Sequence, residues 1–114
     1  MALRRDDTIA ALATAPGVGA IAVIRLSGPK ARDIARELTG REPRPRIADL
    51  RTLRDGSGAT LDRGLVLFFP APSSFTGEDV VELHCHGGRA VADAVLGRTP
   101  EISFDGLTAA RYGQ

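Results

Sequence analysis

The sequence predicts one domain of the α+β class, built on a mixed β-sheet of about five strands with two flanking helices. Three observations support this fold class. The chain has 114 residues, the usual length of a single domain. Runs of β-branched and other apolar residues, bounded by Gly or Pro, recur along it and are typical of strands. Two segments instead repeat their apolar residues at helical spacing, as helices packed on a sheet do.

Strand and helix patterns alternate in the first half of the chain. Residues 7–14 carry an Ala-rich apolar run that fits either a strand or a short capped helix. Residues 20–28, AIAVIRLSG, are rich in β-branched side chains and predict a buried strand. Residues 30–40 predict a helix that begins after Pro29 and ends at Gly40. Its apolar positions recur at helical spacing: Ala31, Ile34, Ala35 and Leu38.

The second half continues with three strand patterns and one helix pattern. A proline-broken basic linker at 41–46 precedes a short edge strand at 48–54. Residues 61–69 predict another strand, and 79–86 the last strong one. Residues 89–97 predict the start of an amphipathic helix. Beyond it the apolar periodicity is lost, so the structure of the remaining residues is the least predictable part.

Composition narrows the classes of function. Fifteen basic and fourteen acidic residues give a net charge of +1, so no global field favours nucleic acid or an anionic membrane. The single cysteine forbids an internal disulfide, and the chain shows neither a signal peptide nor an apolar run of about 18 residues. We therefore expect a cytoplasmic location and no membrane partner.

Two nucleotide-binding patterns bear on the function of the chain. Residues 17–22 read GVGAIA and fit the GxGxxA form of the dinucleotide fingerprint. That fingerprint needs a strand before it and a helix after it, whereas these glycines precede a strand, which favours a tight turn at 15–19. No GxxxxGK[ST] phosphate loop occurs in the 114 residues. We therefore expect the chain by itself to hydrolyse no nucleotide.

Residues 79–86, DVVELHCH, carry most of the chemically active side chains. Period-two alternation places Val80, Glu82, His84 and His86 on one face, and Val81, Leu83 and Cys85 on the other. Cys85 therefore cannot join the histidines as a metal ligand or nucleophile pair. Glu82, His84 and His86 could form the donor set of a metal-dependent hydrolase. A ligand-binding strand and a structural strand with partly buried polar groups are the alternatives.

Two charged residues stand inside apolar strands. Glu82 is flanked by apolar residues, so its carboxylate must be solvated, paired or bonded to a ligand. Arg25 has the same surroundings within 20–28, where it needs a carboxylate, an anionic ligand or a path to water. The two residues could also pair with each other. On the residues alone these possibilities stay open.

Two long segments of the chain read DTIAALATAPGVGAIAVIRLSG and LDRGLVLFFPAPSSFTGEDVVELHCHGG. They resemble the N-terminal domains of the tRNA modification GTPase family MnmE, also called TrmE. The resemblance covers residues 1–96 as a family-like domain, truncated after the HGG-containing strand and the first helix turns. Residues 97–114 then form a divergent C-terminal tail. The resemblance implies a fold similar to the tetrahydrofolate-binding domain of aminomethyltransferases. It also implies that the domain of this chain dimerises and binds a 5-formyl-tetrahydrofolate-type cofactor.

The resemblance also implies site residues and partners. The family's folate-contacting arginine and glutamate fall on Arg25 and Glu82, and no catalytic or metal-binding residue is implied. In the family, the whole protein and an MnmG-like flavoprotein modify the wobble uridine of certain tRNAs with GTP hydrolysis. We therefore expect a folate-binding and dimerisation module, with a ligand-free structural dimerisation fragment as the alternative.

Overall fold

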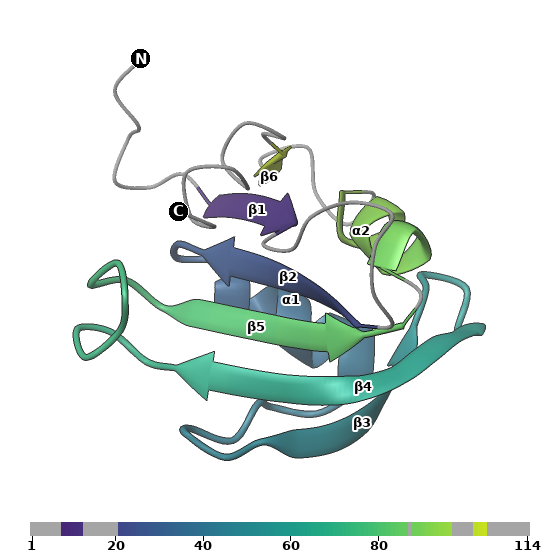
Figure 1. Cartoon of the computed structure of the whole chain (residues 1–114), viewed down its shortest axis with the longest axis horizontal. Helices are drawn as coiled ribbons and strands as arrows, with labels where there is room; N and C mark the ends of the chain where they lie inside the picture. The colour runs from purple at the N-terminus through teal and green to yellow at the C-terminus, as the bar shows by residue number, and fades with distance from the viewer. Residues whose placement is uncertain (1–7, 13–20, 87, 97–101, 105–114) are drawn as a thin grey trace.

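The computed structural model describes residues 8–12, 21–86, 88–96 and 102–104. These residues form a 6-stranded sheet in the order β3-β4-β5-β2-β1-β6, together with two helices (Figure 1). Neighbouring strands are antiparallel except for the parallel pair β1–β6, so the sheet is mixed. The elements are β1 (Thr8–Leu12), β2 (Ala22–Ser27), α1 (Ala31–Thr39), β3 (Asp49–Arg54), β4 (Thr60–Phe69), β5 (Val80–Cys85), α2 (Gly88–Leu96) and β6 (Ile102–Phe104). The predicted α+β class is confirmed.

The β1–β6 edge of the sheet decides one alternative that the sequence left open and adds a short strand. The segment that could have been strand or helix is β1, because its backbone pairs with β2 from Ile9 to Leu12. A sixth strand, β6, pairs with β1 and lies inside the segment 97–114 that was expected to be a divergent tail. Three residues are too few for a periodic pattern to show. The tight turn predicted at 15–19 lies outside the described residues.

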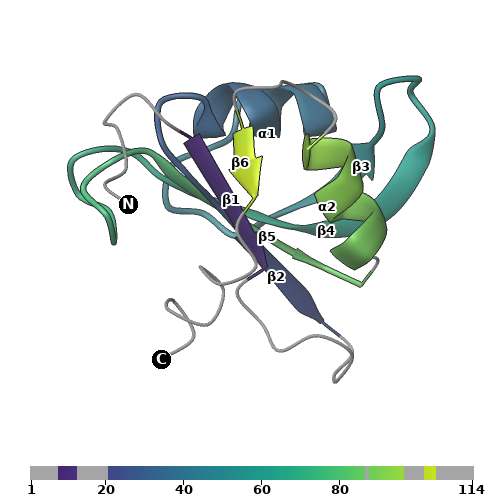
Figure 2. The ribbon, with the colours of Figure 1, turned by 90° about the horizontal axis from the view of Figure 1, so that it is seen from above.

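The core lies between one face of the sheet and the two helices. Helix α1 lies behind β2, β5 and β4 in Figure 1 and on one side of the sheet in Figure 2. Alternate strand residues point toward it, and Val91 and Val95 of α2 join the same cluster. Its larger members on the strands and α1 are Ile24, Leu26, Leu53, Val66, Phe68, Val81, Leu83, Ile34 and Leu38. The residues between them, including Arg25 and Glu82, therefore point to the opposite face.

Helix α1 is fixed by a hydrogen bond to β1 at its start and by a local cap at its end. At its start the Thr8 hydroxyl accepts a hydrogen bond from the Lys30 backbone N–H over 2.9 Å. At its end Gly40 adopts φ 80°, and its N–H donates a hydrogen bond to the Arg36 carbonyl over 2.7 Å. The left-handed conformation is easy only for glycine, which explains why the helix stops there. Neither helix in the described part of the chain is long and apolar enough to cross a membrane.

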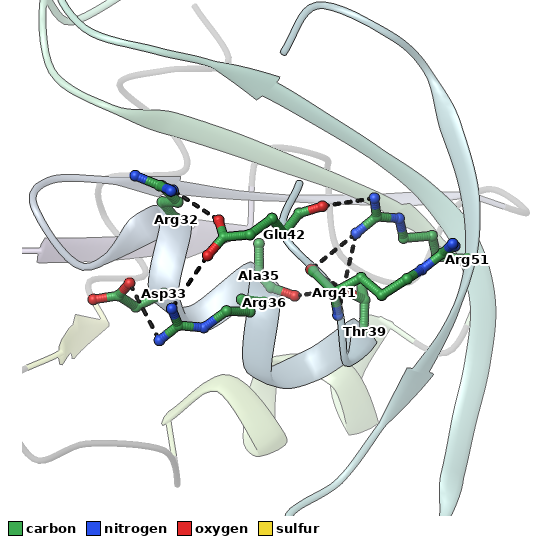
Figure 3. A network of polar contacts seen from close by, with 8 residues as sticks. All are labelled: Arg32, Asp33, Ala35, Arg36, Thr39, Arg41, Glu42 and Arg51. Carbon is green, nitrogen blue, oxygen red and sulfur yellow. Dashed lines mark hydrogen bonds and ion pairs between the residues drawn. The ribbon is translucent and has the colours of Figure 1, made fainter. Parts of the chain in front are cut away.

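A buried guanidinium holds the segment that follows α1 (Figure 3). The side chain of Arg51, on β3, is 3% exposed. It donates hydrogen bonds to the carbonyls of Arg41 (3.0 Å) and Glu42 (2.8 Å), and also contacts Asp49 and Thr39. The Glu42 carboxylate in turn binds two arginines of α1, Arg32 and Arg36. The basic run predicted as a linker is therefore tied to both α1 and β3.

The backbone of β5 passes close to β4 at Gly64. A Cβ atom at this position would lie 2.5 Å from the carbonyl oxygen of His84 and 3.3 Å from the Cβ of Cys85. Real Cβ atoms essentially never approach backbone so closely, so only glycine fits without a shift. Gly64 therefore helps to set the position of His84 beside the polar face of the sheet.

Candidate functional site

Arg25 and Glu82 lie side by side on neighbouring strands. They are register partners in the antiparallel pair β2–β5, which explains why the two charges within apolar runs meet. Arg25 Nε and Nη2 both donate to Glu82 Oε2, over 3.0 and 2.7 Å. The side chains are 18% and 19% exposed, so the pair is largely but not fully shielded from water. The pairing that the sequence left open is present.

His84 contacts the second oxygen of the same carboxylate. Its Nε2 atom lies 3.0 Å from Glu82 Oε1, and because an ionised carboxylate can only accept, this nitrogen donates. Burial acts to raise the pKa of Glu82, but the hydrogen bonds from His84 and Arg25 outweigh it and hold that pKa below its usual range. Glu82 is therefore a carboxylate at neutral pH and is oriented from both sides.

A pocket of about 370 Å³ opens over this pair. Such a volume lies within the range of about 300 to 1,000 Å³ that is usual for small-molecule sites. Its lining comes from three strands, the 70–79 loop and the segment after α1: Arg25, Arg46, Phe69, Ser73, Ser74, Phe75, Val80 and Glu82. Phe75 is 77% exposed, and its ring centre lies 5.6 Å from the Arg25 guanidinium carbon. The pocket thus combines a carboxylate, guanidinium groups and accessible aromatic surface.

Of the eight lining residues the sequence interpretation named only Arg25 and Glu82 as site residues, and the six that it missed include Phe75 and Arg46. Phe75 is in a loop of turn-forming residues, and Arg46 ends a proline-broken basic run. Neither sits in a periodic pattern, so no sequence signal tied them to Arg25 or Glu82. A large aromatic residue in a polar loop is the only hint, since such residues are usually buried.

The histidines do not converge with Glu82 as a metal site requires. His84 does contact Glu82, but β5 ends at Cys85 and period-two alternation ends with it. His86 therefore turns toward Asp62, with its ring nitrogen 3.9 Å from that carboxylate and its backbone N–H 2.6 Å from it. Within the described ranges, no three His, Cys, Asp or Glu residues are placed to hold a metal ion.

Cys85 lies on the opposite, buried face, as the alternation predicted. Its thiol contacts the Ala22 carbonyl oxygen at 3.7 Å. Burial, with a smaller contribution from the Asp62 charge, raises the pKa of this thiol to about 11. A thiol with so high a pKa is not a nucleophile at neutral pH. Cys85 is therefore a core residue and plays no part in the polar site.

The chain is similar to known proteins over most of its length. A family model described as "GTP-binding protein TrmE N-terminus" matches residues 8–114, a range that continues past the domain boundary expected at Leu96. A tRNA modification GTPase MnmE from Sodalis glossinidius (strain morsitans) is 49% identical over 112 residues, which cover 98% of this chain and 24% of that protein. Another from Stutzerimonas stutzeri (strain A1501) is 53% identical over 108 residues, which cover 95% of this chain and 23% of that protein. The chain thus spans about a quarter of the length of these relatives, and it belongs to the family of TrmE N-terminal domains.

Proposed function

We propose that this chain is the tetrahydrofolate-binding module of a tRNA wobble-uridine modification protein and that its ligand is of the 5-formyl-tetrahydrofolate type. One observation carries the proposal. Arg25 and Glu82, the two positions on which the family's folate contacts fall, lie together in the 370 Å³ pocket. Membership of the TrmE N-terminal family supports the wider role in tRNA modification.

The chemistry of the pocket suits a folate. The pterin ring presents an amino-pyrimidine edge whose N–H groups pair with a carboxylate, and Glu82 is held ionised at the pocket. The ring is planar and aromatic, and Phe75 offers exposed aromatic surface at the rim. The tail of a folate carries carboxylates, for which guanidinium groups are the preferred partners. All three parts of the ligand therefore have a matching group.

Calorimetric titration of 5-formyl-tetrahydrofolate tests the proposal. We expect the wild-type chain to bind, and Arg25→Ala and Glu82→Ala each to bind roughly ten- to a hundredfold more weakly, because each removes a charge-assisted contact. Arg63→Ala and Glu37→Ala are matched controls, since both residues are exposed and neither lines the pocket. Variants that bind as tightly as the parent would refute the assignment of these two residues. Absence of binding and of any folate-induced thermal shift in the wild type would instead favour a ligand-free dimerisation fragment.

We further propose that the module self-associates. Strand β3 is an edge of the sheet in the described residues, and an edge strand can pair with a strand of another chain. Beside that edge, Leu50 and Leu65 are register partners on the face away from α1, and they are 54% and 38% exposed. A second copy paired through this surface would cover both features. Light scattering at about 100 μM should detect a dimer that Leu50→Lys weakens, and a purely monomeric chain would contradict this.

The proposed substrate and protein partner are those that membership of the family suggests. In this proposal the module acts in the cytoplasm as part of a longer MnmE-like protein, with tRNA as substrate and an MnmG-like flavoprotein as partner. GTP hydrolysis would belong to other parts of that protein. The name of these relatives, tRNA modification GTPase MnmE, supports the roles of tRNA and GTP in this assignment.

A further inference from the structure

Arg46 is the second guanidinium of the pocket, and its position is fixed by several contacts. Its backbone adopts φ 59°, a conformation that is uncommon for a residue other than glycine. Its N–H bonds the Phe68 carbonyl over 2.8 Å, and Pro45 forms a bridge to the same residue at the end of β4. The Arg51 network holds the start of this segment at Arg41 and Glu42. The backbone at Arg46 is therefore held directly by β4, and the start of its segment is held by Arg51 of β3.

The side chain of Arg46 is directed into the pocket by two further contacts. Its Nη2 donates to the carbonyl oxygen of Ser73 in the 70–79 loop. Its guanidinium carbon lies 5.9 Å from the centre of the Phe69 ring, which also lines the pocket. A guanidinium has five N–H donors, and one of them is used by Ser73. The remaining donors can meet a ligand in the pocket.

The charges of the pocket are not balanced. Arg25 is neutralised by Glu82, with two hydrogen bonds to one oxygen. Arg46, in contrast, makes no ion pair with any residue that the structure describes. The pocket lining therefore carries one uncompensated positive charge, and it is on Arg46. An anionic group entering the pocket meets attraction at Arg46 without having to displace an internal partner.

We propose that Arg46 is an anion-binding residue of this pocket that receives the carboxylate-bearing tail of the ligand, while Glu82 receives the ring. The inference rests on the proposed folate-binding function and adds an orientation and a specificity residue to it. Arg46 discriminates between a folate and a pterin without a tail. Glu82 contributes to the binding of both ligands.

The test compares three ligands by calorimetry: 5-formyl-tetrahydrofolate, 6-methyltetrahydropterin, which has the ring alone, and 4-aminobenzoylglutamate, which has the tail alone. We expect Arg46→Gln to bind the folate roughly ten- to a hundredfold more weakly and the ring alone as tightly as the wild type. Arg44→Gln is the matched control, because it removes the same charge two residues away and Arg44 does not line the pocket. We expect it to leave all three affinities unchanged. Arg46→Lys, which keeps the charge, should restore part of the lost affinity.

Each contrary result has a distinct meaning. If Arg46→Gln binds the folate like the wild type, the inference is wrong while the proposed function stands. If Arg46→Gln weakens the ring alone as much as the folate, Arg46 shapes the pocket rather than binding an anion, and the inference is again wrong. If the wild type binds neither the folate nor the ring alone, the proposed function fails. The inference is then tested by the binding of 4-aminobenzoylglutamate, which has the tail alone. Binding of the tail that Arg46→Gln abolishes would support it, and no binding of the tail would overturn it.

Discussion

The Arg25–Glu82 pair allows a direct test of whether its two residues serve the ligand or the fold. The perturbation is a double-mutant cycle with Arg25→Gln, Glu82→Gln and the double variant, all measured without ligand. Exposed ion pairs contribute about 0.2 to 1 kcal/mol, and breaking a fully buried pair costs about 3 to 5 kcal/mol. With side chains 18% and 19% exposed, this pair lies between these limits. Both of its hydrogen bonds end on a single oxygen, so it lacks the stronger two-oxygen geometry.

We therefore expect a coupling free energy of about 1 to 2 kcal/mol. Small domains have free energies of unfolding of about 5 to 15 kcal/mol, so all three variants should remain folded. Urea unfolding followed by circular dichroism gives the four free energies and their slopes. A coupling above about 3 kcal/mol, or a single variant that is unfolded at about 25 °C, would refute this reasoning. The pair would then hold the sheet together, and weaker ligand binding by the variants could not be assigned to a lost ligand contact.

Three further changes test the structure around the site by urea unfolding. Arg51→Met should lower the free energy of unfolding by about 3 to 5 kcal/mol, because it leaves the Asp49 carboxylate and two backbone carbonyls without their buried cation. Gly64→Ala should cost about 1 to 3 kcal/mol, since the new Cβ meets a backbone oxygen at 2.5 Å. The pKa of Glu82 is lower in the folded chain than its ordinary value of 4.5, so its stabilising contribution is present above that pH and is lost as pH falls through the folded-state value. The stability difference between wild type and Glu82→Gln should therefore shrink in acid.

Controls and contrary outcomes are specific to each change. Arg54→Met alters an exposed arginine on the same strand and should lower the free energy of unfolding by under about 1 kcal/mol. If Arg51→Met lowers it by no more than Arg54→Met does, the Arg51 network does not stabilise the fold. Gly56→Ala places its Cβ in open space and should be neutral within about 0.5 kcal/mol, so equal costs at Gly56 and Gly64 would contradict the close approach. A wild-type advantage over Glu82→Gln that stays constant from about pH 7 to about pH 3 would show that the Glu82 charge does not contribute.

The sequence predicted the polar face of the sheet because two local rules were sufficient there. Period-two alternation separated Glu82 and His84 from Cys85, and the cost of an unpaired charge in an apolar run required partners for Arg25 and Glu82. Both rules act within a single strand. The register that makes Arg25 and Glu82 direct neighbours is a property of two strands, so the sequence could offer their pairing only as one possibility.

The features that the sequence did not predict depend on tertiary contacts. Alanine-rich β1 has little strand preference of its own, and its pairing with β2 decides its conformation. His86 lies one residue beyond β5, where alternation no longer applies. Arg46 reaches the pocket because its segment is held by contacts with residues distant in sequence, Arg51 and the end of β4. None of these contacts leaves a pattern in the neighbouring residues.

The hydrogen bonds of Glu82 limit how a ligand can approach it. A carboxylate has about four acceptor positions, two on each oxygen. Arg25 occupies both positions on Oε2, and His84 occupies one on Oε1. A ligand N–H can therefore bond Oε1 with no rearrangement, whereas an edge that presents two N–H groups needs Arg25 to release one of its bonds. In the proposed function, recognition of the amino-pyrimidine edge then involves an exchange of partners at Oε2. Arg46 makes no ion pair with the residues that the structure describes and uses one donor on the Ser73 carbonyl, so it can hold the anionic tail throughout that exchange.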